Sequence, residues 1–451
     1  MKMNLSKTGT SGTTIGLVVV LIVVVVAAGA YIALNSGGAT TTTVVSTITS
    51  TSTSTSTQVS TSISTSTSTS VSTQTSTQTS TQTSISTYTS TSSLLPSATV
   101  SGAGGTLVFP LMSTWLYAFS QLQPNVQVNY ASVGSGAGIT DITKGTVNFG
   151  ESDAPLTTAQ YSALPSGSTL LTIPISASGV VPAYNIPGLS ATTHVNFTGD
   201  ILAKIFLGQI TTWNDPAITA LNPTISLPSN AIVVIHRSDG SGTMYAFTNY
   251  LSDSNAQWKS QVGTSTTPNW PVGTGCKGNE GVAGCIENNQ YSLGPLEIAY
   301  VLTNSNLIGV SINYGTVQNH AGNFILASLS DITLAMQAGV TNGASVPQGS
   351  TPWTGWSIVN NIYNDSTDTG IYPITTFTYA LIYEDLSASY TGIKTQAQAT
   401  ATVSFIWYCV NQGQTAGANI GYAALPANVV ASDKTTLSLV TYNGATLLTG
   451  S

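Results

Sequence analysis

The chain has 451 residues, a formal net charge of -7 and only 6% charged residues. Its length allows two or three domains. So few basic residues exclude a nucleic-acid-binding surface, which needs clustered lysine and arginine. A surface with few carboxylates also has few groups to protonate, which favours an exported protein in an acidic or harsh medium.

An uncharged apolar run occupies residues 16–34. About 20 such residues cross a bilayer core of roughly 30 Å. Lys2 and Lys7 precede the run, and positive charge on that side predicts a cytoplasmic N-terminus, residues 1–15. A cleaved signal peptide is the alternative interpretation. Because the run is long for a signal peptide, we favour a retained transmembrane anchor.

Residues 35–96 consist almost entirely of serine and threonine with a few glutamine and valine residues. Such a composition cannot bury a core, so the sequence predicts a disordered stalk. Dense serine and threonine suit O-glycosylation, which would stiffen the stalk, whereas without glycans it would be a plain flexible tether. In both cases the segment would hold the following residues away from the membrane.

From residue 97 onward, strand-like apolar runs alternate with helix-like ones. This alternation predicts an α/β fold with helices on both faces of each sheet. The length of this part is best divided into two such lobes. Asn196 and Asn364 begin N-glycosylation sequons.

Three cysteines occur in the chain, and Cys276 and Cys285 lie close enough in sequence to form a disulfide. A disulfide would fit an exported protein, but two buried thiols are also possible. The third, Cys409, lies in an apolar helix-like run. No CxxC pair is present, and the histidines are scattered, so we expect no metal site and no cofactor. These histidines are His194, His236 and His320.

Three glycine-rich loops each precede a helix-like segment: residues 102–110, 133–138 and 239–243. Glycine lets backbone amides turn toward a ligand, and free amides at a helix N-terminus bind anions. A single loop of this kind is more often a helix cap with a tight turn. Three in one chain favour an oxyanion site.

Arg237 is the only arginine in the chain and lies beside the third loop. Its planar fork of donors matches two oxygens of a tetrahedral oxyanion, which lysine cannot match. Asp239 lies two residues further on and could orient the guanidinium group. The alternative is that Arg237 and Asp239 form an ordinary surface ion pair.

Asp153 lies in a fourth loop, residues 149–156. An ionised carboxylate near a bound anion makes sense if the anion still carries a proton, because the carboxylate can accept a hydrogen bond from a P–OH group. Sulfate has no such proton at ordinary pH and would be rejected. Taken alone, however, Asp153 would more often be a turn or cap residue.

These loops together resemble the phosphate-binding proteins that serve high-affinity phosphate ABC transporters. The resemblance covers residues 101 to about 430, and its strongest stretches are "NVQVNYASVGSGAG", "VNFGESDAPLT" and "RSDGSGTMYAFTNYL". It implies the two-lobed type II periplasmic-binding-protein fold. Lobe I would comprise residues 97–178 and 375–451, and lobe II residues 179–374. An anion would be enclosed between the lobes and passed to an ABC permease.

The resemblance also implies which residues bind phosphate. They are Thr106, Leu107 (through its amide), Ser135, Asp153, Arg237, Ser241, Gly242 and Thr243, with Asp239 orienting the arginine. The sequence departs from the family pattern at Leu107, where an aromatic residue is usual, at His236 and in "GPLEIAY", residues 294–300.

Three alternatives stay open at this point. A hydrolase could use Ser241, His236 and either Asp239 or Asp153 as a triad, although no GxSxG motif is present. A stalked surface or S-layer-associated protein could use the fold without a ligand. A receptor of the same fold could bind another oxyanion, such as sulfate or molybdate. We favour a phosphate receptor that is not an enzyme.

Overall fold

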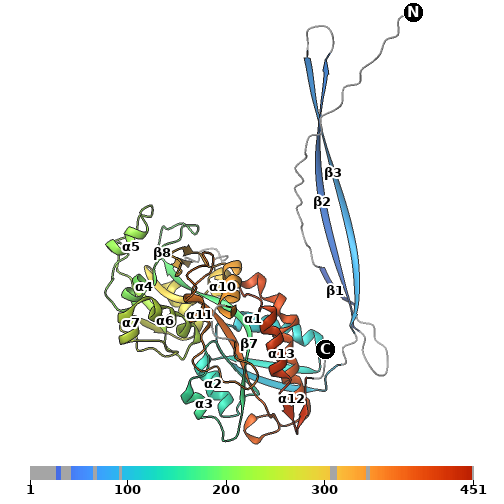
Figure 1. The fold of residues 1–451 in the computed structure, drawn as a ribbon, viewed down its shortest axis with the longest axis vertical. Helices are drawn as coiled ribbons and strands as arrows, with labels where there is room; N and C mark the ends of the chain where they lie inside the picture. Colours follow the sequence, from blue (N-terminus) through green and yellow to red (C-terminus); the bar gives the residue numbers. More distant parts are fainter. Residues whose placement is uncertain are drawn as a thin grey trace, which may run out of the picture. The chain divides into compact units, whose positions relative to one another are not determined.

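The computed structural model describes residues 27–31, 42–63, 69–90, 94–304, 312–341 and 346–448. The chain divides into two compact units, residues 1–94 and residues 95–451. Figure 1 shows the chain with colours that follow the sequence from blue to red.

The first unit contains strands β1 (Ala27–Tyr31), β2 (Thr42–Ile63) and β3 (Thr69–Ser90), paired antiparallel in the order β1-β2-β3. These two strands lie within the predicted stalk, residues 35–96, and disorder of that segment stays a prediction. Threonine and valine are β-branched and favour extended backbone. A regular two-residue repeat can also pair with itself in many registers, so composition alone did not separate strand from disorder.

Most of the predicted membrane anchor, residues 16–34, and the whole predicted cytoplasmic N-terminus, residues 1–15, lie outside the described residues. The described part of the anchor, Ala27–Tyr31, pairs as strand β1 with β2. Within the part of the chain that the structure describes, no helix has both the length and the apolar character needed to cross a membrane.

The second unit is built on one large mixed sheet with the order β10-β9-β11-β7-β15-β6-β4-β5, and β12 also pairs with β7. The strands of this sheet are β4 (Ala98–Gly104), β5 (Val126–Ser132), β6 (Phe149–Ser152), β7 (Leu170–Asn185), β9 (Val233–Arg237), β10 (Thr274–Cys276), β11 (Ser292–Glu297), β12 (Asn313–Tyr314) and β15 (Thr375–Tyr383). Short pairs are formed by β8 (Asn196–Phe197), β13 (Thr316–Gln318) and β14 (Phe324–Ile325), and by β16 (Thr441–Tyr442) and β17 (Ala445–Thr446).

Strand β7 joins the two halves of this sheet. Its residues up to Gly179 pair with β15, and from Val180 it pairs with β11. This exchange of partners lies next to the predicted boundary between lobe I and lobe II, residues 178 and 179. Strands β4, β5 and β6 are parallel to one another, as are β9, β10 and β11. Because β7 and β15 separate the two sets through antiparallel pairings, the sets run in opposite directions and their carboxyl ends both point toward the junction.

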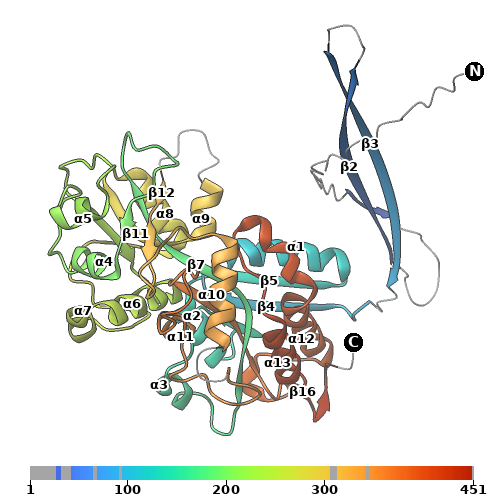
Figure 2. The ribbon, with the colours of Figure 1, turned by 45° about the horizontal axis from the view of Figure 1, so that its top comes forward.

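Helices cover both halves of the sheet (Figures 1 and 2). They are α1 (Phe109–Leu122), α2 (Ser135–Thr143), α3 (Thr158–Ser162), α4 (Gly199–Phe206), α5 (Pro216–Leu221), α6 (Gly242–Ser254), α7 (Ala256–Gln261), α8 (Gly278–Asn288), α9 (Ile298–Asn304), α10 (Leu329–Thr341), α11 (Ile358–Tyr363), α12 (Gln396–Val410) and α13 (Ala427–Leu437). Helices α12 and α13 pack beside each other and on β7, so the C-terminal residues complete the half that β4 begins. All residues of β7 and β15 are buried, as expected for central strands covered on both faces.

Cys276 and Cys285 form a disulfide that ties the end of β10 to helix α8, and Cys409 is a buried free cysteine.

The two predicted glycosylation sites differ in their surroundings. The side-chain amide of Asn196 donates to Leu221 O at 3.1 Å and accepts from Thr316 Oγ1 at 2.6 Å. A glycan on that nitrogen would break this network, which argues against the prediction at Asn196. Asn364 is exposed, and glycosylation there stays a prediction.

Candidate functional site

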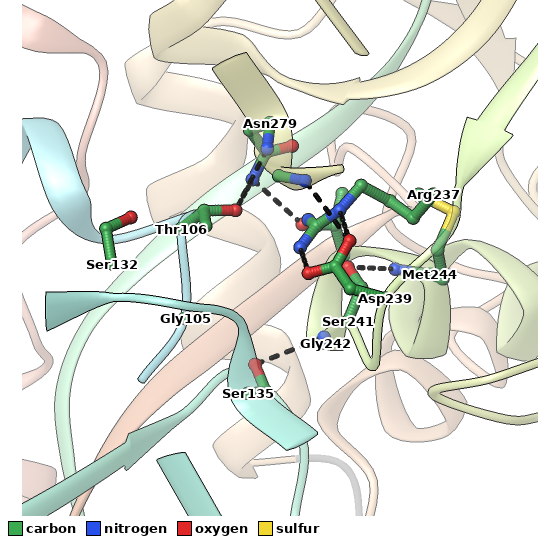
Figure 3. Close-up of polar contacts among 12 residues, drawn as sticks. Gly105, Thr106, Ser132, Ser135, Arg237, Asp239, Ser241, Gly242, Met244 and Asn279 are labelled. Carbon is green, nitrogen blue, oxygen red and sulfur yellow. Dashed lines mark hydrogen bonds and ion pairs between the residues drawn. The ribbon is translucent and has the colours of Figure 1, made fainter. Parts of the chain in front are cut away.

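Four strand–loop–helix junctions meet where the two halves of the sheet join. Strand β4 leads into α1, β5 into α2, β9 into α6 and β10 into α8. The first three contain the glycine-rich loops that the sequence singled out. The fourth, with Gly278 at a φ of +73°, was not recognised as part of the site. Figure 3 shows that residues from all four junctions face one another.

The predicted ligand residues are all buried in this region. Thr106, Asp153 and Arg237 expose 3%, 1% and 3% of their surface. The others, Leu107, Ser135, Ser241, Gly242 and Thr243, are buried as well. A buried cluster of hydroxyl, amide and guanidinium donors is costly unless its hydrogen bonds are satisfied. The contacts below show how these groups are satisfied.

Ser135, the first residue of α2, joins the two halves. Its Oγ donates to Asp153 Oδ2 at 3.1 Å and accepts from the backbone N–H of Asp153 at 3.1 Å and of Gly242 at 3.2 Å. The approach of α6 to Asp153 is so close that a Cβ on Gly242 would lie 2.3 Å from Asp153 Cβ. Only glycine permits this contact. Helix α6 therefore begins directly against the Asp153 loop.

Thr106 joins the halves a second time. Its Oγ1 accepts from the backbone N–H of Asn279 at 3.0 Å and from Asn279 Nδ2 at 3.1 Å (Figure 3). Asn279 Nδ2 also contacts Thr243 Oγ1 at 3.2 Å. Since Thr106 Oγ1 accepts these bonds, its own proton stays free to face an anion. Sequence reasoning missed Asn279, although "CKGNEG" has the same strand–glycine–helix pattern as the other loops.

Arg237 and Asp239 form a two-point ion pair. Arg237 Nε donates to Asp239 Oδ1 at 2.7 Å, and Nη2 to Oδ2 at 2.5 Å. Burial alone would raise the pKa of Asp239. The hydrogen bonds and charge of Arg237, together with the Gly278 N–H, outweigh burial and lower it. The pair uses two of the five guanidinium N–H donors and leaves the rest available to a ligand. Arg237 is thus oriented and buried rather than part of an exposed surface pair.

Asp153 has one satisfied and one unsatisfied oxygen. Oδ2 accepts from Ser135, whereas Oδ1 is buried without a hydrogen-bond partner among the described residues. Burial raises the pKa of Asp153, while the hydrogen bonds from Glu151, Thr378 and Ser135 and the charge of Arg237 oppose that rise. An unpaired carboxylate oxygen in a dry site is costly and marks a place for a donor. A protonated ligand oxygen supplies such a donor.

Three tyrosines hold the carbonyl groups of the first loop. The hydroxyl of Tyr130 donates to Gly105 O at 2.9 Å, that of Tyr300 to Thr106 O at 2.6 Å, and that of Tyr422 to Leu107 O at 2.5 Å. Each peptide unit has its carbonyl opposite its N–H. Fixing three successive carbonyls against tyrosines therefore fixes the direction of the amides that follow, as an anion cradle requires. The tyrosines come from three distant elements, and sequence reasoning did not find them.

Two fully buried acids, Glu151 and Glu297, lie behind this loop. Glu297 Oε1 accepts from Ala299 N at 2.9 Å and from Ser178 Oγ, and Oε2 lies 3.3 Å from the hydroxyl of Tyr422. A phenol has one proton, and that of Tyr422 goes to Leu107 O. The contact with Glu297 therefore uses a carboxylic proton of Glu297. Consistently, burial raises the pKa of Glu297 to about 8.

The serine, histidine and acid of the alternative hydrolase do not form a triad. Ser241 Oγ caps helix α6 by accepting from Met244 N at 3.3 Å. His236 Nδ1 contacts the carbonyl of Arg237 at 2.9 Å, and the His236 ring stacks on Trp270. No group of three or more histidine, cysteine, aspartate or glutamate residues that could hold a metal occurs among the described residues.

Comparison with known proteins identifies the family. The PBP superfamily domain matches residues 37–406. The phosphate-binding protein PstS of Xylella fastidiosa is 35% identical over 334 residues, which cover 74% of this chain and 83% of that protein. This chain belongs to the phosphate-binding protein PstS family. Haemophilus influenzae PstS is 35% identical over 76% of this chain and 95% of its own length. The archaeal PstS of Methanocaldococcus jannaschii is 30% identical over 72% and 82%.

Solved structures agree on the fold. A high affinity periplasmic phosphate-binding protein bound with phosphate aligns with a TM-score of 0.54 at 19% identity, over 74% of this chain and 92% of that one. The phosphate binding protein of Stenotrophomonas maltophilia aligns with a TM-score of 0.53 at 17% identity, over 78% and 96%. The predicted α/β periplasmic-binding-protein fold is thus confirmed. PstS proteins are binding proteins and not enzymes, so the hydrolase alternative is dropped.

Proposed function

We propose that this PstS-family protein is the extracytoplasmic receptor of a phosphate ABC transporter, and that the four junctions enclose one inorganic phosphate ion. The observation that carries the proposal is the buried meeting of Thr106, Ser135, Asp153 and Arg237, with Asp153 Oδ1 unpaired. Phosphate is a tetrahedral oxyanion that retains a proton near neutral pH, and Asp153 Oδ1 would accept a hydrogen bond from that P–OH group.

The eight predicted phosphate-binding residues come from both lobes. Lobe I contributes the Thr106 hydroxyl, the Leu107 amide, the Ser135 hydroxyl and the Asp153 carboxylate. Lobe II contributes the remaining donors: Arg237, Ser241, Gly242 and Thr243. The direct contacts of Ser135 with Gly242 and of Thr106 with Asn279 support closure of one lobe on the other. Closure removes water from the site, which strengthens each charge-assisted hydrogen bond.

Partner and location follow from the family. A receptor of this kind delivers its ligand to the permease subunits of an ABC transporter. We further propose that residues 16–34 tether the protein to the cytoplasmic membrane, with the serine- and threonine-rich segment as a spacer. The support is the uncharged apolar run and the lysines that precede it. Recovery of the full chain in the membrane fraction, and its release when residues 1–34 are deleted, tests the tether.

The binding proposal is tested with Arg237→Lys. Lysine keeps the charge but loses the planar fork, so phosphate affinity is expected to fall about tenfold or more. Equilibrium dialysis with radiolabelled phosphate measures the change, and circular dichroism verifies that the variant is folded. Lys204→Ala, which removes a half-exposed cation paired with Asp200 outside the site, is the matched control and should leave affinity unchanged. Equal affinity of Arg237→Lys and the unmodified protein would contradict the proposal.

A further inference from the structure

A second carboxyl group lies against Asp153. A Cβ placed on Gly105 would come within 2.5 Å of Asp153 Oδ2 and 2.6 Å of Glu151 Oε2, so both oxygens converge on one side of the first loop. Each of these two buried carboxyl groups shifts the pKa of the other. Two carboxylates in contact in a dry site cannot both be ionised, so the pair shares a proton.

The surroundings of Glu151 indicate which group holds that proton. Glu151 is fully buried, and its Oε1 accepts from Thr378 Oγ1 and its Oε2 from Gly105 N. A neutral carboxylic acid can accept both of these bonds and still donate its own proton. The Tyr130 hydroxyl oxygen lies 2.9 Å from Oε2 and 2.9 Å from Gly105 O, and it donates its single proton toward these two acceptors, so the Tyr130 contact leaves the proton of Glu151 for Asp153.

The charges that face the pair favour an ionised Asp153. Arg237 acts on Asp153 and stabilises its negative charge, and Ser135 donates to it. Glu151 has no cation among the groups that shift it, and burial followed by the charge of Asp153 raises its pKa well above the ordinary value. The other ionisable groups that interact with the two carboxyls or with Tyr130 are Glu297, Tyr300, Tyr379 and Tyr422.

We propose that Glu151 is a specificity-determining residue of this site: as a neutral acid it donates its proton to Asp153, keeps Asp153 ionised, and so makes the pair reject oxyanions that carry no proton. This inference rests on the proposed phosphate function. Without the proton from Glu151, the buried Asp153 would itself become protonated in mild acid. A protonated Asp153 is a hydrogen-bond donor. It could donate to an oxygen of sulfate, and it would no longer accept a hydrogen bond from the P–OH group of phosphate.

The test compares phosphate and sulfate binding by calorimetry at about pH 5 and about pH 7.5, values on either side of the second phosphate ionisation. Glu151→Ala is expected to lose about tenfold in phosphate affinity at the acid pH and to gain measurable sulfate binding there. Glu151→Gln keeps a donor toward Asp153 but replaces one of the two oxygens that accept from Thr378 and Gly105, so it is expected to bind phosphate more weakly and still to reject sulfate as the unmodified protein does. Asp433→Ala removes another buried acid, which lies in α13 and whose pKa responds to burial alone, and should change neither.

Each outcome decides a separate point. Failure of the unmodified protein to bind phosphate at either pH overturns the proposed function itself. Phosphate binding with unchanged sulfate rejection in Glu151→Ala overturns only the role of Glu151. If Glu151→Ala does not fold, Glu151→Met, which fills the same space without a proton, replaces it. Sulfate binding by the unmodified protein at about pH 5 contradicts the inference without any variant.

Discussion

The buried acid Glu297 makes the stability of this protein depend on pH in a direction opposite to that of an ordinary salt-bridged carboxylate. Its pKa rises from 4.5 to about 8 on folding. Below the lower value it is protonated in both states and has no effect. Between the two values the unfolded chain is ionised while the native protein keeps the proton, so the native state loses about 1.4 kcal/mol per pH unit. Above about pH 8 the loss is complete, at roughly 5 kcal/mol.

The substitution Glu297→Gln isolates this effect. Glutamine copies the neutral acid: its Oε1 still accepts from Ser178 and Ala299, and its Nε2 donates to the Tyr422 oxygen that Glu297 contacts. Because glutamine never ionises, the variant is expected to be about as stable as the unmodified protein at about pH 4. At about pH 7 it should be more stable by about 3 kcal/mol.

Guanidinium denaturation curves of both proteins at several pH values measure the difference. Asp433 and the Glu151–Asp153 pair contribute their own pH dependence, but they are present in both proteins and cancel in the comparison. Stability curves that run parallel from about pH 4 to about pH 8 would show that Glu297 is not a neutral acid in the native state. Such parallel curves would also contradict the assignment of the Tyr422 proton to Leu107 O.

Three further predictions concern the site and its support. Gly242→Ala pushes a methyl group into Asp153, which costs the closed form about 1–3 kcal/mol and should weaken phosphate binding about 5- to 150-fold in calorimetry, with the fold intact. Asp153→Asn places an amide in the site and should weaken phosphate about tenfold or more while admitting sulfate; unchanged selectivity in competition dialysis would contradict its assigned role. Loss of the Cys276–Cys285 disulfide in a double serine variant should lower the free energy of unfolding by about 2–3 kcal/mol, and an equal denaturation midpoint would argue against that support.

Local patterns in the sequence were enough to single out the candidate binding residues. Arg237, Asp153 and the glycine-rich loops lie next to strand ends, and glycine before a helix has a direct physical meaning. The structure brings them together as expected.

Long-range partners were not predictable in this way. Asn279 lies 173 residues from Thr106, and Tyr422 lies 315 residues from Leu107. No short pattern links such pairs, because the contacts exist only after β7 and β15 have aligned the two halves of the sheet. The role of Glu151 was missed in the sequence for a different reason. It lies in the quoted "FGESDAPL" stretch, but one carboxylate two residues from another does not reveal that both face the same loop.

For the serine- and threonine-rich segment, composition and β-propensity point to different structures. Its composition lacks the large apolar residues that build a core, which predicts disorder, yet threonine favours extended backbone and β2 and β3 pair along 22 residues each. Two physical tendencies of the same residues compete, and composition does not rank them.

The central claim is that the four junctions bind phosphate and read its proton. Calorimetric titration of the purified protein with phosphate, and then with sulfate, tests this most directly. We expect saturable heat from phosphate at one site per chain and none from sulfate. Equal heats from both anions would keep an oxyanion site but contradict the role of Asp153, and no heat from either would contradict the receptor function itself.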